Sequence, residues 1–144
     1  MRFRDAGVAR NFGIDIVHQH FMLIPAFTVA ENLALFGATD GVSELDVSPD
    51  AIVRDLSVGE QQRVEIARAL ASGRAVVLFD EPTAVLTPDE SRQLLDRLRR
   101  LADEGRGVVL ITHRVEEALA VADRITVLRG GKVVRQLTPR EATE

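Results

Sequence analysis

The sequence predicts an α/β fold with a mostly parallel β-sheet that is flanked by helices. One observation is a pair of short, uninterrupted apolar segments at 75–79 and 108–111, the pattern of buried parallel strands, followed by a third predicted strand at 125–128. A second is the helical spacing of apolar residues between them, at 87–102 and 115–122. Because alternating strands and helices favour right-handed crossovers, we expect the three strands to share one sheet.

The N-terminal part is less regular and predicts three shorter features. Residues 14–17 predict a short strand. Residues 28–35 predict a helix, because Thr28 and Glu31 have the spacing of a capping box. Residues 37–49 are rich in Gly, Asp, Ser and Thr and predict a loop.

Capping and turn residues delimit the elements of the C-terminal part. The segment 57–71 predicts a helix with Ser57 as its N-cap, and Thr87 is the predicted N-cap of the next helix. The pair Gly130-Gly131 predicts a turn into a hairpin strand at 133–137. These signals complete a chain of alternating helices and strands.

The composition argues against several classes of function. The 144 residues carry a formal net charge of −4 and contain no cysteine. A basic nucleic-acid footprint, a disulfide framework and a thiolate metal site are therefore not expected. The sequence shows neither a secretory signal pattern nor an apolar run of roughly 18 residues, the length that crosses a membrane. If the protein works at a membrane, we expect it to do so from outside the bilayer.

Two adjacent carboxylates, Asp80 and Glu81, follow the apolar segment at 75–79. A strand that delivers two acids to its end suits metal and water chemistry at a nucleotide phosphate. Asp80 can hold Mg²⁺, usually through water, and Glu81 can polarise the attacking water. The alternative is an ordinary strand followed by an acidic helix cap. The Pro82-Thr83 pair that follows directly favours the chemical interpretation.

A polar helix start at 56–63, with the sequence LSVGEQQR, is a second candidate site. Ser57 is the predicted N-cap, and Gly59 lets the backbone approach an anion. With a free hydroxyl and free N–H groups, such a helix N-terminus can bind phosphate. An ordinary capped helix is the alternative, although the run Glu-Gln-Gln-Arg is unusual for a cap alone.

His113 and Gln19 are the remaining candidates. His113 stands at a predicted strand end, one strand after the two carboxylates, where it can donate a hydrogen bond to a terminal phosphate. A purely structural histidine is the alternative. Gln19 is neutral and long enough to reach a metal-bound water. His18 and His20 flank it, but no third ligand is spaced nearby, so we do not expect a metal site there.

In this order the four elements resemble the motifs of the ABC ATPase family. Gln19 matches its Q-loop glutamine, Leu56 to Gln62 (LSVGEQQ) its signature motif, Val76 to Glu81 (VVLFDE) its Walker B motif with the general-base glutamate, and His113 its switch histidine. The wording of VHQHFMLIPAFTVAENL, LSVGEQQRVEI and DEPTAVLTPDE is similar to the ATP-binding subunits of bacterial importers for nucleosides and simple sugars. Those subunits usually carry two cassettes in tandem, and the chain resembles the first.

The resemblance implies a P-loop NTPase-like fold and an ATPase that couples ATP binding and hydrolysis, with Mg²⁺, to solute import. It implies that Glu81, His113 and Gln19 are catalytic, and that Asp80 and Gln19 hold Mg²⁺, partly through water. It also implies a head-to-tail dimer with a second cassette, whose ATP is contacted by the signature residues Ser57, Val58, Gly59, Glu60 and Gln61.

The resemblance also implies partners and a location. The partners are transmembrane permease subunits, touched by the Gln19 loop, and indirectly a solute-binding protein, with no nucleic acid. We expect the protein in the cytoplasm, peripheral on the inner face of the cell membrane.

Two departures from the family limit these expectations. The family's phosphate-binding loop, the Walker A motif Gly-x-x-x-x-Gly-Lys-Ser/Thr, is absent from the sequence, whose sole lysine is Lys132. The stretch between the Q-loop and the signature is also shorter than in the family. We therefore expect a fold that is incomplete at its N-terminus, with a Q-loop region at 1–27, a shortened helical subdomain at 28–56, and a core at 57–144 that holds the signature, Walker B and switch histidine.

Since phosphoryl transfer depends on positioning and electrostatics, we expect that these 144 residues alone do not hydrolyse ATP. The leading hypothesis is a truncated transporter ATPase subunit. The alternative is a catalytically dead interaction module, which docks on membrane subunits through the Gln19 loop or on an intact cassette through Ser57 and Gly59. An ABC ATPase of DNA repair or translation fits less well, because such proteins resemble the chain less at 17–33 and the acidic balance gives no nucleic-acid footprint.

Overall fold

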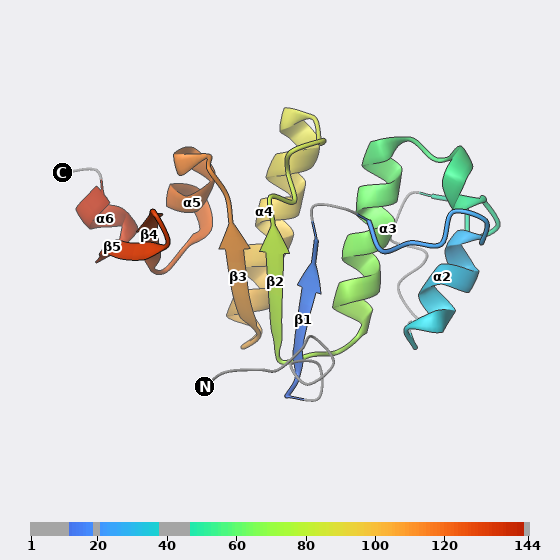
Figure 1. Ribbon diagram of the computed structural model, residues 1–144, viewed down its shortest axis with the longest axis horizontal. Coiled ribbons are helices and arrows are strands. Elements are labelled where there is room, and N and C mark those ends of the chain that lie inside the picture. The colour runs from blue at the N-terminus through green and yellow to red at the C-terminus, as the bar shows by residue number, and fades with distance from the viewer. Residues whose placement is uncertain (1–11, 19–20, 38–46, 143–144) are drawn as a thin grey trace.

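The computed structural model describes residues 12–18, 21–37 and 47–142 and has the α/β architecture that the sequence predicts. Strands β1 (Ile14–Val17), β2 (Val76–Asp80) and β3 (Gly107–Ile111) form a parallel sheet in the order β1-β2-β3 (Figure 1). The register pairs Ile14 with Val76, and Val76 with Gly107. The three strands lie within a residue of their predicted positions, and the apolar segments were sufficient to place β2 and β3.

Helices α3 (Val58–Ala71) and α4 (Pro88–Asp103) pack against one face of this sheet. Residues of β2 alternate in burial, and Val77 and Phe79 point into the core. The shared core consists of Val17, Ile66, Ala69, Leu70, Val77, Phe79, Leu94 and Leu98. Because these side chains come from two strands and two helices, their burial fixes α3 and α4 against the sheet.

Three helices begin with a complete capping box, in which an N-cap hydroxyl and a glutamate three residues later satisfy each other's backbone N–H groups. The pairs are Thr28 and Glu31 before α2 (Val29–Leu35), Ser57 and Glu60 before α3, and Thr87 and Glu90 before α4. The predicted N-caps are therefore confirmed. Within the described ranges, every helix is too short or too polar to span a lipid bilayer.

A second, smaller core lies on the other side of α3. Helix α2 and the 3-10 helix η2 (Val53–Asp55) contribute to it together with α3. Its members are Leu23, Val29, Leu33, Val53, Val64 and Ala67. The segment 28–56 thus packs on α3, while its division from the rest as a subdomain stays a prediction. Most of the predicted loop at 37–49, namely residues 38–46, lies outside the described residues.

The C-terminal part contains α5 (Val115–Val121), β4 (Ile125–Arg129), β5 (Lys132–Leu137) and α6 (Pro139–Ala142). Strands β4 and β5 form an antiparallel hairpin across a two-residue turn. Gly130 and Gly131 have φ values of 57° and 74°. A type I′ turn needs positive φ at both central positions, which glycine adopts without steric cost. The predicted hairpin is confirmed.

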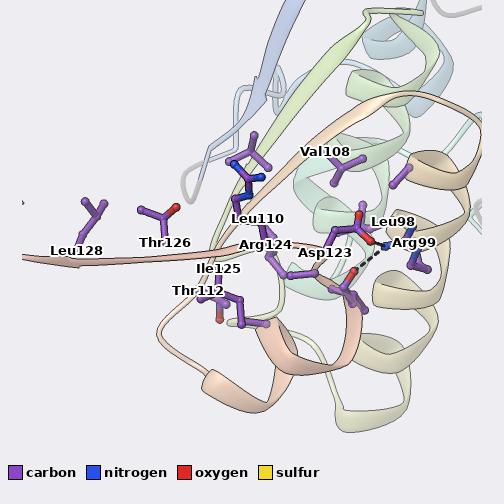
Figure 2. A pocket seen from close by; sticks show the side chains of 15 residues that line it. Leu98, Arg99, Val108, Leu110, Thr112, Asp123, Arg124, Ile125, Thr126 and Leu128 are labelled. Atoms are coloured by element: carbon purple, nitrogen blue, oxygen red, sulfur yellow. Dashed lines mark hydrogen bonds and ion pairs between the residues drawn. The ribbon is translucent and has the colours of Figure 1, made fainter. Parts of the chain in front are cut away.

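The expectation that β4 joins the parallel sheet is wrong, because within the described residues β4 pairs only with β5. Side chains from β3, α4, α5 and β4 line a cavity of about 520 Å³, and Figure 2 shows how these side chains lie around it. The ion pair between Arg99 and Asp123 (2.9 Å) ties α4 to the segment before β4. Strand β4 instead finds its partner two residues further along the chain, where little loop-closure entropy is lost.

Candidate functional site

Polar residues follow β2 and β3 at the same edge of the sheet. β2 ends at Asp80 and β3 ends at Ile111, and these two residues pair in the parallel register. The arrowheads of β1, β2 and β3 point to one side of the molecule, where the N-terminus of α3 also lies (Figure 1). Ligands of parallel sheets bind beyond the carboxyl ends of the strands, so this edge is the candidate site.

Glu81, directly after β2, has a backbone conformation that is rare outside glycine. Its φ is 48°, in the left-handed region. Its N–H donates to the carbonyl oxygen of Ile111 (2.9 Å), and its own carbonyl oxygen accepts from the N–H of Ala84 (3.2 Å). Such a conformation costs on the order of 1–3 kcal/mol and persists where the surroundings hold it. Here the end of β3 and the following turn hold it.

The strained turn brings the carboxylate of Glu81 to the histidine that follows β3. Glu81 Oε1 lies 3.0 Å from His113 Nδ1, although the two residues are 32 positions apart. The side chain of Glu81 is 31% exposed and that of His113 is 72% exposed. When the carboxylate is charged, Nδ1 carries the proton in this contact, and Nε2 is left as the second ring position for a ligand.

A second contact between the two strand ends is one that sequence reasoning missed. The buried carboxylate of Glu117, on α5, accepts hydrogen bonds from the hydroxyls of Thr83 (3.0 Å) and Thr112 (2.9 Å). Thr83 follows β2 and Thr112 follows β3. No local pattern marks Glu117, because its role depends on partners that only the fold brings together.

The helix start of α3 differs from its prediction in one respect. The hydroxyl of Ser57, expected to be free, donates to Glu60 Oε2 (2.7 Å) and accepts from the N–H of Glu60 (3.3 Å). The N–H of Ser57 also donates to Glu60 Oε2 (2.8 Å). A glutamate at this position completes a capping box, so the polar groups that would bind a phosphate satisfy each other instead.

Electrostatics at this helix start follow from the same contacts. The hydroxyl of Ser57, and then its backbone N–H, lower the pKa of the Glu60 carboxyl by hydrogen bonding to the charged form. The carboxylate therefore stays charged at neutral pH and lies where an incoming phosphate would bind.

The start of α3 is joined to the start of α4. Arg63 Nη1 donates to Glu90 Oε1 (2.7 Å), and both side chains are about one-third exposed. A Cβ on Gly59 would meet the same oxygen at 3.7 Å, an ordinary contact. The side chain of Gln61 is held locally, because its Nε2 donates to the carbonyl oxygen of Leu56 (3.0 Å), just before α3 begins. These contacts hold the signature segment against the helix that follows Asp80 and Glu81.

Gln19 lies outside the described residues, together with His20. The chain on either side of it is held by one buried ion pair of α3. Glu65 and Arg68 pair at 2.8 Å and are 0% and 1% exposed. Glu65 Oε2 accepts from the N–H of Met22 (3.3 Å), and Arg68 Nη2 donates to the carbonyl oxygen of Ile16 (3.4 Å). Ile16 and Met22, which lie before and after Gln19 in the sequence, are thereby both hydrogen-bonded to α3.

The edge of the sheet where β2 ends offers few ligands for a metal ion. Asp80 is partly buried at the end of β2. In the part of the chain that the structure describes, no group of three or more His, Asp or Glu side chains could hold a metal ion. Mg²⁺ is usually held by one or two carboxylates together with substrate phosphates and water. The residues present therefore fit an ion that arrives with a nucleotide, rather than one bound by the protein alone.

Comparison with known proteins places this site in context. A model of the ABC transporter family matches residues 6–84. The chain is 48% identical to the nucleoside import ATP-binding protein NupA of Lactococcus lactis subsp. cremoris, over 88% of this chain and 28% of that protein. It is 42% identical to the ribose import ATP-binding protein RbsA 3 of Rubrobacter xylanophilus, over 100% of this chain and 33% of that protein. The chain thus spans about a third of the length of these relatives or less.

The fold also resembles a solved structure, the dimeric post-hydrolysis state of the ATP-binding cassette MJ0796 bound to ADP and Pi. The TM-score is 0.80 at 29% identity, and the match covers 96% of this chain and 68% of that chain. Both sequence and fold therefore point to the same family as the motifs at the strand ends.

Proposed function

Since this chain belongs to the ABC transporter family, we propose that it forms part of the ATP-binding subunit of an importer for nucleosides or simple sugars. The relatives NupA and RbsA 3, which are import ATP-binding proteins for nucleosides and for ribose, support the choice of solute class. The observation that carries the proposal is the contact of 3.0 Å between Glu81 and His113, directly after Asp80.

Each residue of this cluster has a proposed role. Glu81 accepts a hydrogen bond from the attacking water and orients it toward the γ-phosphate. His113, through Nε2, contacts the terminal phosphate, and its Nδ1 contact with Glu81 keeps the two side chains in one place. Asp80 and Gln19 are the proposed ligands of Mg²⁺. When bound with the nucleotide, this ion would neutralise charge on the phosphates.

The signature segment has a proposed role in a dimer. Ser57, Val58, Gly59, Glu60 and Gln61 would face the nucleotide of a second cassette in a head-to-tail arrangement. The match to a dimeric cassette supports this arrangement. Because Glu60 occupies the helix N-terminus, its rotation away from Ser57 would accompany nucleotide binding. The proposed further partners are permease subunits at the Gln19 loop and, indirectly, a solute-binding protein, with the subunit on the cytoplasmic face of the membrane.

We expect that these 144 residues do not hydrolyse ATP on their own. The sequence contains no Gly-x-x-x-x-Gly-Lys-Ser/Thr motif, whose backbone N–H groups and lysine would hold the β- and γ-phosphates. The sole lysine, Lys132, begins β5 in the hairpin and is exposed. Purified chain that turns over ATP, and loses this turnover in Glu81→Gln, would contradict the expectation.

The importer proposal is tested by supplying the missing motif. A segment that carries a Gly-x-x-x-x-Gly-Lys-Ser/Thr motif is joined to the N-terminus of this chain, and ATP turnover is measured. We expect turnover that falls by about 10²–10⁴-fold in Glu81→Gln, since a positioned base contributes that much. Glu116→Gln, an exposed carboxylate on α5, is the control and should keep full turnover. Turnover that is insensitive to Glu81→Gln would overturn the proposed role of this residue.

The absence of the motif from the sequence also favours a second candidate, an interaction module that lends its signature segment to an intact cassette. The chain is mixed with full-length NupA, with and without Mg-ATP, and association is measured by sedimentation. The module predicts association that requires nucleotide and is lost in Gly59→Asp. Ala71→Asp, at the other end of α3, is the matched control. Absence of nucleotide-dependent association would exclude this candidate.

A further inference from the structure

Glu117 is a buried carboxylate that none of the proposed roles uses. It lies on α5 and is 8% exposed. Oε2 accepts hydrogen bonds from the hydroxyls of Thr83 (3.0 Å) and Thr112 (2.9 Å). Oε1 accepts from Arg114 Nη1 (3.1 Å), whose side chain is 47% exposed. A buried carboxylate needs such partners, because desolvation of an unpaired charge is costly.

The two threonines belong to the loops that carry the proposed reacting residues. Thr83 lies two positions after Glu81, and Thr112 directly precedes His113. Thr83 is 2% exposed, so its hydroxyl has little access to water as an alternative partner. Both hydroxyls donate to the same oxygen atom. Glu117 therefore connects the loop after β2 with the loop after β3 through one atom.

This connection bears on a backbone that is under strain. Glu81 has a φ of 48°. The hydrogen bond from its N–H to the carbonyl oxygen of Ile111 links the two strand ends through the backbone. A residue in this region keeps its conformation only where neighbouring contacts hold it. The bridge through Glu117 supplies a second link, on the side of the loops that lies beyond the strands. With both links, the carboxylate of Glu81 and the ring of His113 stay within hydrogen-bond distance.

We propose that Glu117 is a positioning residue. Through the hydroxyls of Thr83 and Thr112, it holds the side chains of Glu81 and His113 within hydrogen-bond distance of each other. The inference rests on the proposed function, which gives the contact between Glu81 and His113 its purpose. The contact itself exists without nucleotide. Glu117 touches neither a nucleotide nor the reacting atoms in this role. It acts on them only through the two loops.

The test uses the full 144-residue chain without nucleotide. The ring nitrogen shifts of His113 are measured by long-range ¹H–¹⁵N NMR at about pH 8, where an unperturbed imidazole is neutral, and His113→Asn assigns the signals. Glu81→Ala gives the Nδ1 shift of the broken contact. We expect the Nδ1 signal in Glu117→Ala to move most of the way to that value. Glu116→Ala, which removes an exposed carboxylate one position away on the same helix, should leave it at the wild-type position.

A double variant, Thr83→Val with Thr112→Val, removes the two donors and keeps the charge of Glu117. It should move the Nδ1 signal as Glu117→Ala does, and it carries the test if Glu117→Ala does not fold. Thermal unfolding is followed in parallel. A folded variant with a lower melting temperature but an unmoved Nδ1 signal would overturn the proposal, because Glu117 would then only stabilise the fold. An unmoved signal in Glu81→Ala would overturn it as well, since there would be no pair to position. Because no nucleotide is present, failure of ATP turnover or of dimerisation leaves this result unaffected.

Discussion

At the ends of β2 and β3, polar side chains find partners far away in the sequence, whereas the N-cap residue of α3 finds its partner within one helical turn. Glu81 meets His113 across 32 positions, and Thr83 meets Glu117 across 34. Ser57 and Glu60, by contrast, are three positions apart and remain exposed or partly exposed. Both regions belong to the proposed nucleotide site, but only the first depends on the whole fold.

The difference teaches where each region obtains its order. A local pair forms whenever its helix forms, and solvent competes with it throughout. A distant, buried pair forms only when strands and helices have packed, and it then has no water as a substitute. We therefore expect distant, buried contacts to dominate the stability of the site, and local, exposed ones to adjust when a ligand arrives.

The largest effect is expected for Arg68→Ala. Arg68 is 1% exposed and pairs with Glu65 at 2.8 Å and with Asp15 at 3.9 Å, which joins α3 to β1. It also lies over the ring of Phe36, 4.6 Å from the centroid. Its removal leaves the buried carboxylate of Glu65 without the guanidinium that it pairs with, and breaking such a pair costs about 3–5 kcal/mol. Urea unfolding of the purified chain measures this free energy.

The control for this variant is Arg92→Ala. Arg92 also pairs with a carboxylate three positions earlier on its helix, that of Asp89, but these side chains are 75% and 78% exposed. Exposed pairs of this kind contribute about 0–1 kcal/mol. Equal losses in the two variants would show that burial does not decide how much such an ion pair stabilises the fold.

A smaller effect is expected for Thr83→Val. The substitution nearly conserves volume and removes the hydroxyl that donates to Glu117. A hydrogen bond to a charged group contributes about 1.5–3 kcal/mol, and the loss should fall in this range. Urea unfolding with Thr138→Val in parallel provides the comparison, because Thr138 donates to Glu141 (2.9 Å) at an exposed position three residues away. A larger loss for Thr138→Val than for Thr83→Val would contradict the expectation.

The same contrast explains what the sequence could and could not predict. The strands at 76–80 and 107–111 were found because a buried parallel strand contains a continuous apolar segment. The N-caps Ser57 and Thr87 were found because a cap is read within four residues. Strand β4 was assigned to the wrong sheet, since no local pattern shows which edge a strand will pair with.

The site follows this division as well. Asp80, Glu81 and His113 could be placed at strand ends from sequence, because a strand end is a local feature. Glu117 could not be found, because its partners are set by the packing of α5 beside two loops. Ser57 is the exception among local features: the free hydroxyl was expected although Glu60 stands at capping-box spacing. The capping box of Ser57 and Glu60 is itself a pattern that the sequence contains.

Ser57→Ala is expected to have a modest effect. It removes the N-cap hydroxyl of α3, and loss of such a cap costs typically about 1 kcal/mol. Urea unfolding measures the loss, and Ser48→Ala, an exposed serine outside any helix, is the control with no expected change. A cost as large as that of Arg68→Ala would mean that this helix start is held by more than its local contacts.

The smallest effect concerns pH and isolates Glu60. Hydrogen bonds from Ser57 lower the pKa of Glu60 in the folded chain below 4.5, the value of an unperturbed glutamate. Between these two pKa values the unfolded chain binds more protons, so stability falls as pH falls. The contribution of Glu60 is therefore complete above about pH 5 and is lost as the pH drops through its lowered pKa. The pKa values of Glu90, Asp103 and Glu141 are lowered as well, so the wild-type curve contains at least four such contributions from the described residues. The difference in unfolding free energy between wild type and Glu60→Gln, measured in urea from about pH 6 to pH 3, isolates one of them and should shrink toward acid. A difference that stays constant over this range would mean that the charge of Glu60 does not stabilise the start of α3. The Ser57 hydroxyl would then be the only part of this capping box that stabilises the helix.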